Sequence, residues 1–331
     1  MIRRRQLLSG LAIATVYWPL GARAQQGARM RRVGFLTTEN DNAYRPAIQA
    51  FQKGLAELGW VENRNLRLDF RFSNGDPNRI NTYAAELVSL APDVIVCVTS
   101  AATKAVQQRT QDIPIVIAGV GDPILNGIVK NVARPDGNTT GVTNLYAGMS
   151  GKWVQLLKEV APSVERVGIV FNGQIPPDEQ RFGYIRSIEQ AAQMFAIQAV
   201  TVPYYGSVDF VSAIDAFAAK PNGGLVVTPP APIAADRDII RTLAMAHHLP
   251  AVYHAKYYAA EGGLLAYGAS PMVVNARAAH YVNRILRGAK PSDLPIEYPT
   301  KFEFAINLRT FRAMGLTIPR TMLAAADEII E

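Results

Sequence analysis

Residues 94–118 decide the fold: they read VIVCVTS at 94–100, AATKAVQQR at 101–109 and IPIVIA at 113–118. Val94 to Val98 is apolar at every position, which indicates a strand buried on both faces. A helical stretch and a second apolar run follow it. Parallel strands need a crossover connection, usually a helix, so this order is typical of a parallel sheet with helices on both faces. The sequence therefore predicts an α/β protein.

The same alternation continues in both directions from this stretch. Upstream, Val33 to Leu36 is typical of a buried strand, and Ala47 to Leu58 has apolar residues at helical spacing before Gly59 ends the pattern. Further strand-like runs, separated by helical patterns, lie at 66–72, 167–171, 199–202, 225–227, 251–253 and 264–267. Two sets of about four or five such units predict two Rossmann-like lobes with parallel sheets.

We expect three crossing segments between these lobes. The segment 131–148, which contains the turn-forming sequence PDGN at 135–138, is the first candidate. The candidates for the second and third are 264–267 and 299–304. The resulting division is a signal peptide at 1–24, a first lobe at 31–145 plus 267–300, and a second lobe at 146–266 plus 301–331.

The first 24 residues have the three parts of a secretory signal. Arg3, Arg4 and Arg5 are followed by a mostly apolar stretch from Leu7 to Leu20 and by the small residues of Ala22-Arg23-Ala24. Because RRQLL at 4–8 also fits a loose twin-arginine pattern, the Sec and twin-arginine routes both stay open. The alternative is a membrane anchor or a buried helix. We expect a cleaved leader and a periplasmic protein.

Charge and cysteine content exclude several classes of protein. The chain has 331 residues with 34 Lys and Arg against 27 Asp and Glu, and four of the basic residues lie in the leader. The 30 that are left nearly balance the acids, so we expect no nucleic-acid partner. Cys97 is the only cysteine, which excludes an intrachain disulfide, and its apolar neighbours are typical of a buried core residue.

The motifs of catalysis and cofactor binding are incomplete. Gly119-Val120-Gly121 begins like a dinucleotide fingerprint, but the third glycine is missing and Asp122-Pro123 follows. The sequence around Gly151-Lys152 fails as a phosphate loop, and there is no Gly-x-Ser-x-Gly elbow and no His-Glu-x-x-His motif. We therefore expect no cofactor, no metal site and no enzymatic activity.

Polar and aromatic residues follow the predicted strands, where parallel sheets bind their ligands. We take as ligand-binding candidates the residues Thr37, Thr38, Thr99, Ser100, Asp122, Tyr146, Asn172, Tyr204, Thr228, Tyr253 and Tyr267. Each also has an ordinary structural explanation. Thr99 or Ser100 suits a helix cap, Asp122 before Pro123 suits a turn, and tyrosines at strand ends often only pack.

Four stretches of the sequence carry a resemblance to a known family. They are WPLGARAQQ at 18–26, VGFL at 33–36, the stretch from GDP at 121 to ARPDGNTTG at 133–141, and a C-terminal set comprising GAKPSDLP at 288–295, PTKFE at 299–303, INL at 306–308 and GLTIP at 315–319. In these the chain resembles the tryptophan/tyrosine-type substrate-binding proteins of ABC transporters, which have the type I periplasmic binding protein fold. The likeness covers essentially the whole mature chain.

This resemblance implies two lobes that close around a small molecule and deliver it to an ABC permease. Family members of known ligand bind amino acids, notably aromatic ones. By that likeness Thr99, Ser100 and Asp122 are placed to hold a carboxylate and an ammonium group, and tyrosines of the second lobe to stack on the ligand. The sequence departs from the pattern at 228–232, TPPAP, so other small carboxylates stay open.

We expect a monomer that binds a small molecule, opening when empty and closing on its ligand by a hinge motion. Two alternatives stay open: a sensor module that presents its ligand to a receptor, and an exported enzyme built on the same sheets. A DNA-binding regulator shares the type I fold, but its helix-turn-helix would precede the first lobe, where this chain has its signal segment.

Overall fold

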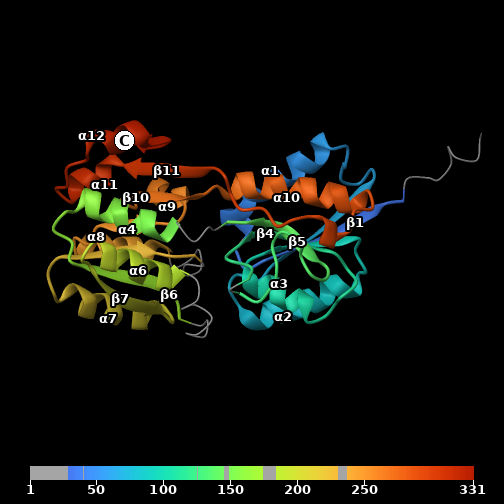
Figure 1. The fold of residues 1–331 in the computed structure, drawn as a ribbon, viewed down its shortest axis with the longest axis horizontal. Coiled ribbons are helices and arrows are strands. Elements are labelled where there is room, and N and C mark those ends of the chain that lie inside the picture. The colour runs from blue at the N-terminus through green and yellow to red at the C-terminus, as the bar shows by residue number, and fades with distance from the viewer. Residues whose placement is uncertain (1–28, 40, 125, 145–148, 174–183, 230–236) are drawn as a thin grey trace, which may run out of the picture.

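The structure, a computed structural model, describes residues 29–39, 41–124, 126–144, 149–173, 184–229 and 237–331. It consists of two α/β lobes that lie side by side (Figure 1). One lobe is built on a five-stranded sheet and the other on a seven-stranded sheet. The predicted fold class of two Rossmann-like lobes is thereby confirmed. The predicted signal peptide at 1–24 lies outside the described residues.

The sheet of the first lobe has the strand order β2-β1-β3-β4-β5, and every neighbouring pair in it is parallel. The chain builds outward from β1 to β2 and then returns to place β3 on the other side of β1. The ends of β1 and β3 therefore flank a topological switch point, where open parallel sheets bind ligands. The strands are β1 (Arg31–Thr37), β2 (Leu66–Phe72), β3 (Val94–Val98), β4 (Ile115–Val120) and β5 (Thr139–Thr143).

Helices cover both faces of this sheet. On one face the residues of α1 and α10 share a core with the strands, and the residues of α2 and α3 do so on the other. Both cores are lined by the apolar strand residues that the sequence identified, and Cys97 is buried among them, as expected. These helices are α1 (Asp41–Glu57), α2 (Pro77–Ser89), α3 (Ser100–Gln107) and α10 (Pro271–Leu286).

The sheet of the second lobe has the order β12-β11-β10-β9-β8-β6-β7, with its own switch point between β6 and β8. Its strands are β6 (Arg166–Asn172), β7 (Gln198–Tyr204), β8 (Gly223–Val227), β9 (Ala251–Tyr253), β10 (Leu265–Ala269), β11 (Phe302–Asn307) and β12 (Glu328–Ile330). Its helices are α4 (Met149–Val160), α6 (Arg186–Met194), α7 (Ser207–Ala218), α8 (Arg237–Ala246), α9 (Lys256–Ala260), α11 (Leu308–Ala313) and α12 (Arg320–Ala325).

The first lobe is assembled from two distant parts of the chain. Figure 1 shows α10, near the C-terminal end of the sequence, lying against α1 of the first lobe. The chain passes from one lobe to the other after β5, again after β10, and a third time before β11. Strand β10 runs on to Ala269, two residues past Tyr267, so the second passage begins slightly later than the sequence suggested.

All three expected crossing segments contain residues of strands that belong to a sheet. The stretch 139–143 is β5 at the edge of the first sheet, where Gly141 (φ 135°) lies against the backbone of Ile117 more closely than a side chain would allow. Strands β10 and β11 pair antiparallel, with Tyr267 opposite Phe304. The sheets are otherwise parallel, as expected, and the sequence did not reveal the reversed direction of β11, because an apolar pattern does not encode strand direction.

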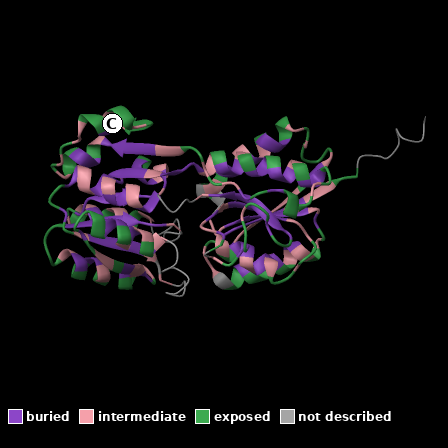
Figure 2. Cartoon of the chain, in the orientation of Figure 1, coloured by how far each residue is buried: buried purple, intermediate pink, exposed green. Residues whose placement is uncertain are grey.

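Burial follows the layers of each lobe. Figure 2 shows the strands buried almost throughout, while the helices alternate buried and exposed faces. A search for helices long and apolar enough to cross a membrane found none among the described residues.

Candidate ligand-binding cleft

In the first lobe, the candidate residues lie at the carboxyl ends of the strands, as predicted. Thr37 ends β1 and is buried, and its Oγ1 accepts a hydrogen bond of 3.1 Å from the backbone N–H of Glu39. Thr38 is half-buried. Thr99 follows β3 with a φ of 91° and caps α3, its Oγ1 accepting from the N–H of Ala102 at 3.4 Å. Ser100 begins the helix beside it.

Asp122 follows β4 and faces the second lobe. Its Oδ1 accepts a hydrogen bond from the N–H of Ile124 at 2.9 Å, which is the turn role considered from the sequence. Tyr184 of the second lobe lies opposite. Its hydroxyl oxygen is 3.7 Å from the position where a Cβ on Gly121 would sit. Burial, together with the negative charge of Asp122, raises the pKa of Tyr184 well above its ordinary value. This is one place where the two lobes meet.

The candidates on the second lobe are in part outside the described portion. Tyr146 lies among the residues that are not described, and of Asn172 only the backbone at the end of β6 is described. Thr228 is buried just after β8, and its Oγ1 donates to the carbonyl oxygen of Val170 at 3.0 Å. That bond joins the ends of β6 and β8 at the switch point of the second sheet.

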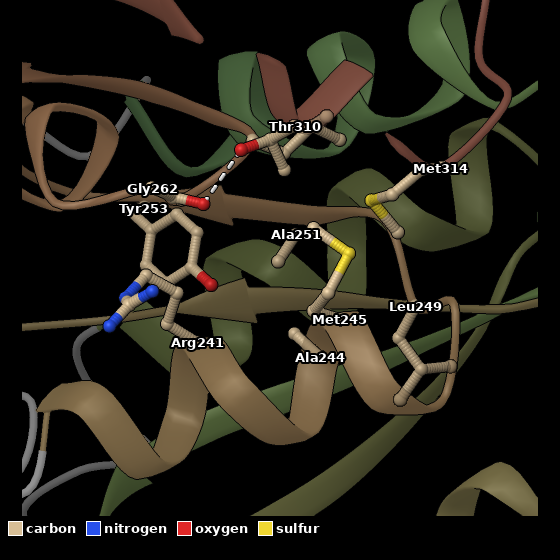
Figure 3. A pocket seen from close by; sticks show the side chains of 11 residues that line it. Arg241, Ala244, Met245, Leu249, Ala251, Tyr253, Gly262, Thr310 and Met314 are labelled. Atoms are coloured by element: carbon tan, nitrogen blue, oxygen red, sulfur yellow. Dashed lines mark hydrogen bonds between the residues drawn. The ribbon is translucent and has the colours of Figure 1, made fainter. Parts of the chain in front are cut away.

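Two of the candidate tyrosines pack inside the second lobe. Tyr204 is buried against Phe210, with ring centroids 5.3 Å apart. Tyr253 is stacked on Tyr258 at 4.8 Å and lines the small cavity of Figure 3, beside Arg241 of α8. That cavity has room for roughly one water molecule and is lined entirely by second-lobe residues, so it is not a cleft between lobes.

Tyr267 lies on β10, close to where the chain leaves the second lobe. Its ring stacks on Phe302 of β11 at 5.6 Å, and its carbonyl oxygen accepts a 2.7 Å hydrogen bond from the Nε1 of Trp153. The Trp153 ring lies 5.7 Å from that of Tyr184. The hydrogen bond from Trp153 and its ring contact with Tyr184 therefore link the strands beside the crossing to the face that meets Asp122.

Sequence reasoning missed a second group of residues where the lobes meet. In the first lobe these are Glu39 and Tyr44, whose hydroxyl accepts a 2.7 Å hydrogen bond from the Nδ2 of Asn275. In the second lobe they are Arg237, His254 and Tyr257. The signal available in the sequence was position alone: Glu39 is the second residue after β1, and His254 directly follows β9.

Arg237 and Tyr257 form the second-lobe side of this group. The Cζ of Arg237 lies 4.5 Å from the centre of the Tyr257 ring, a cation–π contact, and an Nη of Arg237 pairs with a carboxylate oxygen of Glu261 at 3.2 Å. Only 13% of the Arg237 side chain is exposed, and its buried Nε has no hydrogen-bond partner among the described residues. A buried donor of this kind is suited to an acceptor on a bound molecule.

His254 is uncharged at neutral pH. Burial lowers its pKa from 6.5 to about 4, with the nearby Arg237 adding to the effect and a hydrogen bond to the carbonyl of Val227 opposing it. Its Nδ1 lies 3.3 Å from that carbonyl oxygen, and its Nε2 lies 3.4 Å from the Tyr257 hydroxyl. The ring thus acts as a fixed hydrogen-bonding group beside Arg237, without contributing charge.

The described residues contain no group of three or more His, Cys, Asp or Glu side chains that is arranged to hold a metal ion. The side chains on the two surfaces where the lobes meet (the meeting faces) are instead single charges, hydroxyls and aromatic rings. Such a set recognises a small organic molecule by charge pairing and stacking.

Comparison with known proteins identifies one similar curated protein and two similar solved structures, among others. A curated tyrosine-binding protein from Clostridioides difficile is 23% identical over 276 residues, 82% of this chain and 76% of that protein. A Streptococcus pneumonia ABC domain solved in complex with L-Trp superposes with a TM-score of 0.83 at 23% identity, covering 91% of this chain and 99% of the other. A conserved domain protein from Vibrio cholerae reaches 0.82 at 26% identity, covering 91% and 100%.

The family profile described as ABC transporter substrate binding protein matches residues 35–330. The match takes in both sheets and every crossing between them, so it concerns the two-lobed architecture as a whole. The match therefore agrees with the two sheets and the switch points described above. This chain belongs to the ABC transporter substrate binding protein family.

Proposed function

We propose that this protein is a periplasmic solute-binding protein that captures an amino acid or a related small carboxylate, aromatic ones included, and delivers it to an ABC permease of the inner membrane. The relatives support the ligand class, since one is a tyrosine-binding protein and another was solved with L-Trp. The signal-like sequence at 1–24 supports export. The protein acts as a monomer and leaves the bound molecule chemically unchanged.

One observation carries the proposal: each lobe directs side chains at the other. Tyr184 of the second lobe faces Gly121 and Asp122 of the first, beside the buried Trp153. Aromatic rings on one side and a carboxylate on the other suit a ligand with an apolar body and a positive charge. A ligand that touches both lobes favours the closed arrangement over the open one.

The ligand-binding candidates identified from the sequence are part of this proposal because of where they lie in the fold. Thr37, Thr38, Thr99, Ser100 and Asp122 line the first-lobe side, and Thr228 the second-lobe side, of a cleft whose lobes divide at about residues 145, 266 and 300. Tyr267 belongs to the crossing itself. The proposed motion is a rotation about the three crossings, with each sheet moving as a unit.

A thermal-shift screen of the mature protein against the common amino acids and aromatic carboxylates tests the proposal. A ligand present at about 100 times its Kd stabilises the folded state by about 2.7 kcal/mol and raises the unfolding midpoint by several degrees. We expect such a shift with at least one aromatic amino acid, and calorimetry then gives its Kd. Chemical conversion of the bound compound, followed by mass spectrometry, would show an enzyme instead.

A further inference from the structure

We propose that Glu39 and Arg237 hold the ionic head group of the ligand between them, Arg237 binding the carboxylate and Glu39 the ammonium group. This inference rests on the proposed function, because it concerns the same cleft and an α-amino acid as its occupant. It differs from the expectation drawn from the sequence, which placed the carboxylate at Thr99 and Ser100 and the ammonium at Asp122.

The two residues belong to opposite lobes, and each lies beyond the carboxyl end of a strand at the switch point of its sheet. Glu39 follows β1 at the switch point of the first sheet, and Arg237 begins α8 of the second lobe. The charge of Arg237 lowers the pKa of Glu39, while burial raises that pKa by more. Burial raises the pKa of Tyr257, whose ring lies under the Arg237 guanidinium, and the charge of Glu39 raises it further. The residues thus share one buried region where the lobes meet.

Glu39 and Arg237 are close without touching. Within the described part of the chain Glu39 makes no ion pair, and the carboxylate paired with Arg237 is that of Glu261, at 3.2 Å. An α-amino acid carries its carboxylate and ammonium on the same carbon atom, so it fits between an acid and a guanidinium that are not themselves paired. It would pair with both groups at once, which matters for Glu39 because an unpaired buried charge is costly.

Arg237 has unused capacity for an anion. A guanidinium has five N–H donors, and the buried Nε of Arg237 has no partner within the part of the chain that the structure describes. The residue also stands in the first turn of α8, where the helix dipole disfavours a cation, so a further negative charge beside it is stabilising. A carboxylate that accepts from a guanidinium fork forms the strongest kind of hydrogen bond available to a small ligand.

Two of the residues that the sequence favoured, Thr99 and Asp122, already use polar atoms in local hydrogen bonds. The Oγ1 of Thr99 accepts from the N–H of Ala102, and an oxygen of the Asp122 carboxylate accepts from the N–H of Ile124. These are a helix cap and a turn, the ordinary explanations of both residues. The structure therefore favours the charged pair over the α3 terminus for the head group.

Calorimetry with matched probes tests the assignment. The probes are L-tryptophan, tryptamine, which lacks the carboxylate, and indole-3-propionate, which lacks the ammonium, together with L-phenylalanine, phenethylamine and 3-phenylpropionate. The variants are Arg237→Gln, Glu39→Gln and Asp122→Asn. Glu62→Gln and Arg312→Gln remove charges of the same kind at exposed positions and serve as controls.

We expect the wild-type protein to prefer the amino acid to its amine by at least about tenfold, as a charge-assisted hydrogen bond provides. Arg237→Gln should remove that preference while changing the affinity for tryptamine by no more than about threefold. Glu39→Gln should remove the preference for L-tryptophan over indole-3-propionate. Arg237→Lys, which keeps the charge but not the fork, should restore part of the carboxylate preference and covers the case in which Arg237→Gln does not fold.

The outcomes separate the two proposals. If the wild-type protein binds neither series, the proposed function fails for aromatic amino acids and this inference fails with it. If the wild-type protein binds L-tryptophan or L-phenylalanine and the preferences survive in both Arg237→Gln and Glu39→Gln, only the head-group assignment is overturned. Loss of the ammonium preference in Asp122→Asn alone would return that role to Asp122.

Discussion

At the scale of single residues, the meeting faces are set by what burial does to charged and polar groups. The guanidinium of Arg237 pairs with Glu261 and lies over the Tyr257 ring, and both contacts offset the cost of burying a cation. His254, beside it, has no carboxylate partner in the described chain and is therefore held neutral. The same burial that raises the pKa of Glu39 thus lowers that of His254, and the two shifts make the faces sensitive to acid.

His254 gives a prediction on pH. Its folded-state pKa of about 4 lies below the ordinary value of 6.5, so the unfolded chain binds a proton first as the pH falls. Stability from this residue is complete above pH 6.5 and is lost as the pH falls towards 4, by about 2 kcal/mol between pH 7 and pH 5. We expect urea unfolding at the two pH values to show this loss, and His254→Gln to remove it.

His280 provides the control, because its side chain is exposed on α10. In His280→Gln the difference in unfolding free energy between pH 7 and pH 5 should equal that of the wild-type protein. An equal pH dependence in His254→Gln and the wild-type protein would mean that His254 is not buried in the way described.

At the scale of elements, helix α4 connects the second-lobe core to the crossing. Trp153 lies on its first turns, is fully buried, and donates to the carbonyl of Tyr267 on β10 at 2.7 Å. Tyr184 lies between Trp153 and the first lobe, 5.7 Å from the indole ring and close to Gly121. Relative movement of the lobes therefore changes the surroundings of Tyr184, and through Tyr184 those of the indole.

We expect ligand binding to change the fluorescence of Trp153. Beyond residue 24 the chain has one other tryptophan, Trp60 in the first lobe, whose Nε1 donates to Asn283 at 3.0 Å within that lobe. The ligand-induced change should persist in Trp60→Phe and disappear in Trp153→Phe, with Kd measured separately by calorimetry. A change that follows Trp60 instead would contradict this placement of the indole.

The sequence predicted elements better than side-chain roles. Periodicity identified the buried strands, since a run such as Val94 to Val98 has no other stable environment. It did not identify β5, whose residues 139–143 are mostly polar or small, nor the antiparallel direction of β11. For the cleft, strand ends pointed to Thr99 and Asp122, but Arg237 and Tyr184 lie well beyond any strand end. Only tertiary packing brings them to the meeting faces.

At the scale of the whole molecule, two sheets with separate cores are joined by a few backbone segments. Each lobe is packed well enough to move as a unit, because the cores lie within the lobes. Strands β10 and β11 enter the crossings side by side and are paired in register, with Tyr267 stacked on Phe302. This pairing couples two of the three crossings, which favours one axis of rotation over independent bending.

Small-angle scattering tests this closure. We expect the radius of gyration to fall on addition of a ligand that raises the unfolding midpoint, and to stay constant with an amino acid that does not. The molecular mass from the same data should be that of a monomer. A radius of gyration that is unchanged at saturating ligand, in a protein with calorimetrically verified binding, would contradict the hinge motion.

The position of α10 has a consequence for how the chain comes to be folded. Helix α1, made near the start of synthesis, finds its packing partner only when residues 271–286 have been made. Until then the apolar side chains of Phe51 and Leu55 lack the surface that covers them in the finished protein. The nascent polypeptide therefore cannot complete its earliest core until most of the chain has been made.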